Sequence, residues 1–322
     1  MPDTLVLVEH NGQRVKGPSL HAIGVARELS DAFALLVLGH GLDPVVSSLA
    51  PYGASAILVA DDPALAERLA DRYAAVIAAV CEQRDVTTIL GASSTFTKDV
   101  LPRAAALLDL PMLSDVLAIE QADGGTVYQR PVRAGSAVST VRLRGRGRVL
   151  TIRAAAFEPP PHSNDSPPSP VEPIPVDAGS LPQATTFLSR AHRDADRPEL
   201  SEARIVVAGG RPLVDRQRFD RLIGGLADVL GGAVGASRAV VDAGVAPNDW
   251  QIGQTGKTIA PDLYVAVGIS GSAQHLAGIT DCRVVVAINN DPDAPIVEAS
   301  TYALIGDLYT IVPRLIDALR QP

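Results

Sequence analysis

Two glycine-containing loops in the C-terminal third of the chain have the composition of a site for an anionic ligand. The first is the polar loop at residues 252–256. The second is the turn at residues 268–271, which follows an apolar run at 263–267 and precedes a helix expected near Ser272. A glycine-containing turn between a strand and a helix lets backbone N–H groups point at an anion, with the helix dipole behind them. The two loops therefore predict a ligand that carries phosphate.

Other polar and charged residues follow the remaining predicted strands of the C-terminal half. These strands are expected at residues 205–208, 233–236, 284–288 and 302–305. Because ligands of open α/β sheets bind beyond the carboxyl ends of the strands, we expect these polar residues to share one edge with Ser270 and Gly271. They are Arg211, Ser237, Arg238, Asn289 and Asp307.

Common short motifs do not match this region. Residues 256–258 resemble the end of a phosphate-binding P-loop, but position 251 is Gln where that motif needs Gly. No dinucleotide-binding glycine pattern, nucleophile elbow, zinc-protease, Cys-pair or calcium-loop motif occurs at the required spacing. From the residues alone, the prediction stops at a phosphate-bearing ligand on a strand-end edge.

The composition is that of a globular protein. The chain has 322 residues, enough for two domains, with 47% apolar and 20% charged residues. A net charge of −8 argues against nucleic-acid binding. The arginine-rich residues 142–148 fit either a solvated hairpin edge, which we favour, or an anion-binding patch.

The cysteines and the hydropathy pattern bear on location. Cys81 and Cys282 lie beside apolar runs without metal-ligand spacing, which predicts buried thiols in a reducing compartment. No apolar stretch reaches the ~18–20 residues of a membrane span. The chain enters an apolar run at Leu5 with no basic leader before it. We therefore expect a cytoplasmic protein.

The elements that must position these residues form an α/β pattern. Apolar strands at 4–9, 34–38, 56–59 and 86–90 alternate with helices that begin near 17, 61 and 93. This alternation predicts a parallel sheet with right-handed crossovers. Four short strands then follow, which we expect to extend the sheet antiparallel, at 116–120, 126–130, 137–142 and 148–152.

A proline-rich stretch at residues 158–182 predicts an extended linker, because proline cannot continue a helix or a central strand. The predicted domains are thus residues 1–182, including the linker, and residues 183–322. The second domain is expected to hold another open α/β sheet, an amphipathic helix at 215–230 and a final helix from Asp307.

Four blocks of the second domain closely resemble the α subunit of electron transfer flavoprotein. They are residues 235–244, 247–257, 267–278 and 287–296, joined by Asp307 and Leu308 at the last helix. The blocks are specific and cover most of residues 204–322. The first domain resembles the family more loosely, through residues 98–106 and 111–115.

The resemblance implies a nucleotide-hydrolase-like α/β domain followed by a Rossmann-like FAD-binding domain. It implies an electron carrier rather than an enzyme, in a heterodimer with a β subunit that holds AMP. One FAD would accept single electrons from acyl-CoA and other flavin dehydrogenases and pass them to a membrane quinone oxidoreductase. The resemblance implies no nucleic-acid partner and no metal.

Each predicted site residue takes its role from the resemblance. Arg238 would stabilise the negative charge that reduction places on the flavin, Thr255 would hydrogen-bond N5, and His275 would donate toward the O2 and N1 region. The ribityl chain and ring would be wrapped by Ile252, Gly253, Gln254, Ser270, Gly271, Ser272, Ala273 and Gln274. The pyrophosphate and adenosine would be held by Arg211, Ser237, Asn289 and Asp307, with Leu308 beside them.

Several alternatives stay open. Asp307 could only cap its helix, Asn289 could only satisfy a turn, and His275 could be a satisfied surface histidine. Arg211 could pair with a nearby carboxylate. Pro212 stands where the family usually has glycine, which puts backbone contacts at that turn in doubt. A flavin-bifurcating member fed by NADH and coupled to ferredoxin, or a nucleotide-binding regulatory module without redox chemistry, would be the competing functions.

Overall fold

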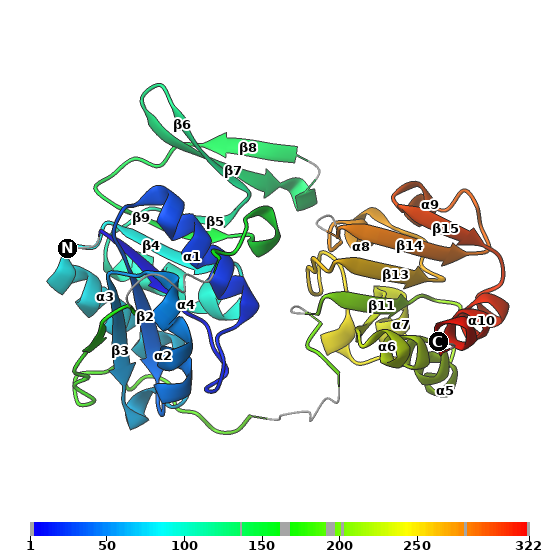
Figure 1. The fold of residues 1–322 in the computed structure, drawn as a ribbon, viewed down its shortest axis with the longest axis horizontal. Coiled ribbons are helices and arrows are strands. Elements are labelled where there is room, and N and C mark those ends of the chain that lie inside the picture. The colour runs from blue at the N-terminus through cyan, green and yellow to red at the C-terminus, as the bar shows by residue number, and fades with distance from the viewer. Residues whose placement is uncertain are drawn as a thin grey trace. The chain divides into compact units, whose positions relative to one another are not determined.

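The computed structural model describes residues 3–135, 137–161, 168–190, 197–200, 203–279 and 282–320. The chain divides into two compact units (Figure 1). The first comprises Met1–Val132 and Ala137–Ala191, and the second comprises Arg133–Ser136 and His192–Pro322. Each unit is an α/β structure with its own mainly parallel sheet, which confirms the predicted fold class.

The first unit is built on a seven-stranded, all-parallel sheet in the order β10-β3-β2-β1-β4-β9-β5. Its central strands are continuous apolar runs, as expected where helices cover both faces of a sheet. The strands are β1 (Thr4–Leu7), β2 (Phe33–Gly39), β3 (Ala56–Asp61), β4 (Thr88–Ala92), β5 (Met112–Val116), β9 (Arg148–Ile152) and β10 (Val171–Pro173).

Four helices cover this sheet. Helices α1 (Gly17–Leu29) and α2 (Asp43–Leu49) pack on one face. Helices α3 (Ala70–Arg84) and α4 (Thr95–Leu107) pack on the other. Ser94 caps α4 through a reciprocal capping box with Thr97, and the helix begins close to residue 93, where it was predicted.

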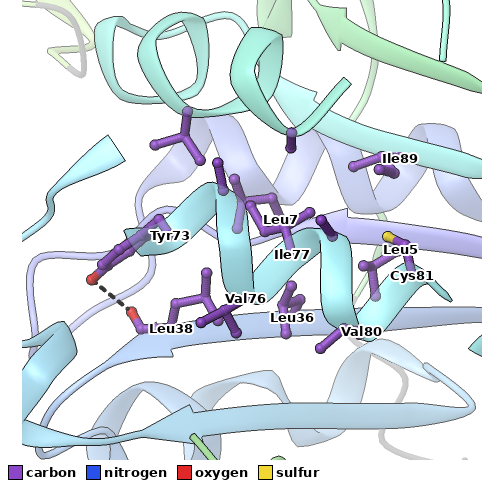
Figure 2. Close-up of a cluster of buried hydrophobic side chains, with 14 of the residues drawn as sticks. Leu5, Leu7, Leu36, Leu38, Tyr73, Val76, Ile77, Val80, Cys81 and Ile89 are labelled. Atoms are coloured by element: carbon purple, nitrogen blue, oxygen red, sulfur yellow. Dashed lines mark hydrogen bonds between the residues drawn. The ribbon is translucent and has the colours of Figure 1, made fainter. Parts of the chain in front are cut away.

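Helix α3 carries the centre of one core cluster (Figure 2). Ile77 is fully buried and contributes to the same cluster as Leu7 and Leu36 of the central strands. Tyr73 is buried beside them, and its hydroxyl shares its one hydrogen between the carbonyls of Leu38 at 3.2 Å and Leu65 at 2.9 Å. The helix is thereby joined to the sheet by apolar packing and by a satisfied polar group.

The four short strands after residue 116 do not extend the sheet antiparallel, and this prediction was wrong. Three of them, β6 (Ala118–Ala122), β7 (Gly125–Val132) and β8 (Ala137–Val141), form a separate antiparallel sheet. The fourth, β9, lies in the main sheet, parallel between β4 and β5. The physical reason is burial, because four of the five residues of β9 are buried, whereas β6, β7 and β8 together have one buried residue, Tyr128.

The arginine-rich residues 142–148 do not share one environment. The Arg142 guanidinium donates to the Asp123 carbonyl at 2.9 Å at the end of the small sheet. The Arg148 guanidinium instead donates to the hydroxyls of Thr88 and Tyr128, at 3.1 and 2.8 Å. The favoured hairpin is absent, because this segment links β8 of the small sheet to β9 of the main sheet, and the two strands do not pair. The anion-binding patch stays a prediction.

Two further predictions need adjustment. The helix expected from residue 61 is a 3₁₀ turn, η2 (Pro63–Leu65), whose cap is Asp62, and α3 begins only at Ala70. The proline-rich stretch is extended, and within it β10 pairs with β3 at the edge of the sheet, where Pro173 is tolerated. Its residues 162–167 lie outside the described part. Other 3₁₀ turns are η1 (Ala50–Tyr52), η3 (Arg133–Gly135) and η4 (Ala154–Ala156).

The second unit is built on a five-stranded, all-parallel sheet in the order β12-β11-β13-β14-β15. From β11 the chain proceeds to β12 on one side and then to β13 on the other. The carboxyl ends of β11 and β13 therefore flank the point where the strand order reverses. The strands are β11 (Ile205–Gly209), β12 (Ala233–Ala236), β13 (Leu263–Val267), β14 (Val284–Asn289) and β15 (Tyr302–Ile305).

One helical segment packs on one face of this sheet. It comprises α5 (Arg216–Phe219), the π turn η5 (Asp220–Gly224) and α6 (Gly225–Leu230), where one amphipathic helix was predicted. The sequence predicts five apolar residues of this segment inside. Four are buried, Phe219, Leu222, Ile223 and Leu226, and the fifth, Leu230, is half-buried. The same core includes α7 (Arg238–Asp242) and α10 (Leu308–Arg320), while α8 (Ala273–Leu276) and α9 (Pro295–Glu298) lie on the other face.

Trp250, the last residue of the 3₁₀ turn η6 (Asn248–Trp250), packs against the core on this face of the sheet. Its ring stacks on Phe219, with centroids 6.0 Å apart, and the Arg216 guanidinium lies 4.8 Å from its centre. The next residue is Gln251, so this aromatic contact adjoins the first of the two glycine-containing loops. None of the described helices combines the length and apolarity that crossing a bilayer requires.

Replacing Ile77 by Ala should lower the free energy of unfolding of the first unit by about 3 kcal/mol, because it leaves a cavity in a fully buried cluster. Urea unfolding followed by circular dichroism measures this loss. Leu188→Ala is the matched control, since Leu188 is 90% exposed and its truncation should change stability by less than ~0.5 kcal/mol. Equal losses in both variants would contradict the assigned core.

Candidate functional site

A cavity of about 520 Å³ lies at the carboxyl ends of β11 to β14. This volume is within the range of small-molecule sites. Most of the predicted site residues line it, and they come from four strand-end loops, the loop after Trp250 and helix α8. They are Arg211, Ser237, Arg238, Ile252, Gly253, Gln254, Thr255, Ser270, Gly271, Ser272, Gln274, His275 and Asn289.

The rim forms because the parallel hydrogen-bond ladder continues past the strands. The Gly210 N–H donates to Val267 O at 2.8 Å, and the Ser237 N–H donates to Gly209 O at 3.0 Å. The Gly268 N–H donates to Ile288 O at 2.8 Å. The first residue of each of these loops is thus fixed against the end of a neighbouring strand. The side chains that follow line the same cavity.

Close approach of the loops explains two of the glycines. A Cβ atom on Gly210 would lie 1.9 Å from the Gly268 carbonyl oxygen. Gly271 has φ +81°, and a Cβ there would lie 2.3 Å from the Ile296 nitrogen. Any side chain at either position would push the two walls of the cavity apart.

The loop at residues 252–256 is tied to both sides of the cavity. The Ile252 N–H donates to Ala236 O at 2.9 Å, which joins the loop to the end of β12. The Gln254 N–H donates to Gln274 O at 2.7 Å, which joins it to α8. The polar loop is therefore held as a wall of the cavity.

Two cations stand at the mouth of the cavity. Arg238 opens α7 and is 68% exposed, with the Asp242 carboxylate 3.3 Å away on the same helix. Arg211 follows Gly210 and forms no ion pair with any other described residue. Because exposed pairs of this kind are weak, Arg238 remains available to an anion in the cavity.

Thr255 is held by a residue that the sequence analysis did not single out. The buried Gln251 side chain donates from Nε2 to Thr255 Oγ1 at 2.9 Å. The Thr255 oxygen is thus used as an acceptor, which leaves its own hydrogen to donate. The only sequence signal for Gln251 is its position directly before the polar loop.

His275 is buried rather than on the surface, with 5% of its area exposed. Its Nε2 atom lies 2.7 Å from the hydroxyl of Tyr264, and its Nδ1 atom has no hydrogen-bond partner among the described residues. Burial lowers the pKa of His275 to about 4. The Ile252 backbone, which approaches the ring without a well-formed hydrogen bond to Nδ1, offsets this lowering of the pKa only in part. The ring is therefore neutral at pH 7.

Three predicted residues do not line the cavity. Asp307 caps α10, where its carboxylate accepts from the Tyr309 N–H at 3.1 Å and the Thr310 hydroxyl at 3.0 Å. Leu308 is buried in the core, and Ala273 begins α8. The cap that was left open as an alternative for Asp307 is present, and a ribose contact by Asp307 stays a prediction.

Asn289 lines the cavity with its side chain already engaged. Its Nδ2 donates to Ile269 O at 2.8 Å, and its Oδ1 accepts from the Asp291 N–H at 3.1 Å. The amide therefore joins the turn after β13 to the loop after β14. This is the turn-satisfying role that was left open for Asn289, and contact with a ligand stays a prediction.

Several lining residues had no individual role assigned from the sequence, and nearly all adjoin residues that did. Gly268 and Ile269 lie within the turn predicted at residues 268–271. Pro212 follows Arg211, and its carbonyl accepts from the Tyr309 hydroxyl at 2.6 Å. The sequence signal available for the others was adjacency to a strand end or loop. They are Ala239, Gln251, Gly268, Ile269, Asn290, Asp291 and Ala294.

Comparison with known proteins places this site in a family. Residues 4–178 match the electron transfer flavoprotein domain, and residues 199–280 match the electron transfer flavoprotein FAD-binding domain. The chain belongs to the electron transfer flavoprotein family, as an α subunit. The FAD-binding match includes the cavity-lining loops from Arg211 to His275. Members of this family are electron carriers.

Relatives over nearly the whole chain support this assignment. An electron transfer flavoprotein α subunit of Paracoccus denitrificans is 42% identical, over 95% of this chain and 96% of its own length. A probable mitochondrial α subunit of Caenorhabditis elegans is 43% identical, over 98% and 93%. A mitochondrial α subunit of Arabidopsis thaliana is 41% identical, over 99% and 90%.

The second unit should lose stability as the pH falls from about 6.5 toward 4. In this interval the unfolded chain binds a proton on His275 that the folded chain, with a pKa of about 4, does not bind. The loss should approach ~2–3 kcal/mol.

His275→Gln should remove most of this pH dependence, as measured by urea unfolding at pH 7 and pH 4.5. Burial also lowers the pKa of His10, but His10 is present in both proteins and cancels in the comparison. If the wild-type chain and the variant lose equal stability on acidification, the buried neutral state of His275 is refuted.

Proposed function

We propose that this chain is the α subunit of a heterodimeric electron transfer flavoprotein and holds one FAD in the cavity of its second unit. It carries single electrons from flavin dehydrogenases, such as acyl-CoA dehydrogenases, to a membrane quinone oxidoreductase. Its β subunit holds AMP. Support comes from the family assignment and from the position of the cavity at the strand-order reversal, where sheets of this type bind nucleotides.

The observation that carries the proposal is the Nδ1 atom of His275. Buried polar atoms in folded proteins have hydrogen-bond partners with few exceptions, and this atom has none among the described residues. His275 lines the cavity, so a ligand with a hydrogen-bonding edge would supply the missing partner. A flavin ring has such an edge, and the residues present therefore fit the cofactor.

The remaining residues divide the binding among them. Bound FAD supplies one-electron chemistry. Arg238 adds positive charge where the reduced ring becomes negative, and Thr255 offers the hydroxyl hydrogen that Gln251 leaves available. Arg211 and Ser237 follow adjacent strands and line the cavity, and they would bind phosphate oxygens. The segments 252–254 and 270–274 would enclose the ribityl chain.

The cellular setting is also part of the proposal. A cytoplasmic location fits the buried thiol of Cys81, whose pKa burial raises to about 12, because a reducing compartment leaves such a residue as a thiol. The relatives include mitochondrial as well as bacterial proteins. Fractionation of the source cells would decide between these locations.

Flavin and AMP quantified per αβ heterodimer test the proposal. One FAD and one AMP would support it. Two flavins per heterodimer would favour the flavin-bifurcating alternative. A colourless complex that takes up no FAD would overturn the proposal and favour a nucleotide-binding module without redox chemistry.

Arg238→Ala should lower the midpoint potential for the first electron by about 40 mV, which corresponds to ~1 kcal/mol of lost charge stabilisation at an exposed site. Spectroelectrochemical titration of the αβ complex measures it. Arg221→Ala is the control, since Arg221 is an exposed arginine on the helical segment away from the cavity. An unchanged potential in the Arg238 variant would refute the role of this cation.

A further inference from the structure

Tyr264 and His275 form a buried polar pair behind the cavity. Tyr264 is fully buried in β13, and His275 is 5% exposed in α8. The Tyr264 hydroxyl oxygen lies 2.7 Å from His275 Nε2, and the two rings are tilted by 36° with centroids 6.2 Å apart. The histidine lines the cavity, whereas the tyrosine does not.

The direction of this hydrogen bond follows from counting partners. The Tyr264 hydroxyl has no other partner among the described residues, and it must place one hydrogen. If His275 Nε2–H donated, the tyrosine hydrogen and the bare Nδ1 atom would both be buried without partners. If Tyr264 donates, only the Nδ1–H group is left, and it belongs to a residue of the cavity wall.

Burial supports this direction, because it raises the pKa of Tyr264 well above its usual value of 10 and the hydroxyl keeps its hydrogen. The strand also fixes the geometry. Tyr264 is paired in register with Val206 of β11 on one side and Val285 of β14 on the other. The phenol therefore approaches the imidazole from a rigid, central strand.

We propose that Tyr264 is a positioning residue that fixes His275 in the tautomer with hydrogen on Nδ1, so that the neutral ring presents an N–H donor to the cavity. This inference deepens the proposed function and rests on it for the identity of the acceptor. A free neutral imidazole populates both tautomers, and the hydrogen bond at one ring nitrogen determines which is present. Tyr264 thus makes Nδ1 of His275 a hydrogen-bond donor to the cavity. Without the tyrosine, Nδ1 could be either a donor or an acceptor.

Nitrogen-15 NMR of the full chain in complex with its β subunit, labelled at histidine, tests the proposal directly. The His275 signals are assigned by their loss in His275→Gln. In the wild-type protein, Nε2 should show the shift of an unprotonated nitrogen and Nδ1 that of a protonated one, with or without FAD. A protonated Nε2 in the wild-type protein would by itself overturn the proposal.

Tyr264→Phe removes the hydroxyl and keeps the ring. We expect the His275 signals to move toward the Nε2-protonated form and FAD affinity, measured by fluorescence titration, to fall about fivefold, the effect of one lost hydrogen bond. The matched control is Tyr73→Phe, which removes a buried tyrosine hydroxyl with carbonyl acceptors in the first unit. It should leave both measurements unchanged.

The two proposals fail in different ways. If the wild-type complex takes up no FAD, the proposed function fails, while the nitrogen shifts still report the tautomer. If FAD binds but Tyr264→Phe leaves the nitrogen shifts and the affinity as they were, the positioning role of Tyr264 is refuted and the FAD site stands. An equal loss of affinity in Tyr73→Phe would also overturn it, because the effect would then be general.

Discussion

The second unit depends on the hydrogen-bond ladder between parallel strands being carried one residue beyond their ends. The backbone N–H groups of Gly210, Ser237 and Gly268 each donate to a carbonyl at the end of a neighbouring strand. The loops that follow therefore begin at the same edge of the sheet. The same ladder brings Gly210 against the Gly268 carbonyl, a contact that excludes any side chain. Without this shared starting level, the polar residues of separate loops would have no common cavity.

Within the cavity, charge and hydrogen-bonding direction are supplied by residues in different environments. Arg211 and Arg238 are exposed, so they keep their charge at little desolvation cost and can meet a charged ligand at the mouth. His275 is buried and neutral, so it contributes a directed polar group without an unpaired charge in the core. A cofactor with an anionic end and a polar ring matches this division.

The sequence predicted the sheet edge well, because a strand buried on both faces is an apolar run whose end is marked by glycine or a polar residue. Arg211, Ser237 and Ser270 were found in this way. The position of β9 was not predictable, because the sequence of a short strand such as Arg148–Ile152 does not indicate which strands it pairs with. Pairing order is decided by packing between distant segments.

The contacts behind the site were also beyond sequence reasoning. In the sequence, Tyr264 cannot be distinguished from the other apolar residues of its strand, and Gln251 cannot be distinguished from the other polar residues of its loop. Their importance comes from side-chain contacts across elements, to His275 and Thr255 respectively. Periodicity and turn chemistry predict where a backbone goes, but they carry no information on which buried polar groups meet.

The placement of Trp250 has a practical consequence. The chain contains one tryptophan, and its half-buried indole stacks on Phe219 at the edge of the core of the second unit. Fluorescence excited selectively at the indole therefore comes from the second unit and carries no signal from the first. The wavelength of the tryptophan emission therefore reports on the second unit. Comparing it with a signal from the whole chain distinguishes unfolding of the second unit from unfolding of the first.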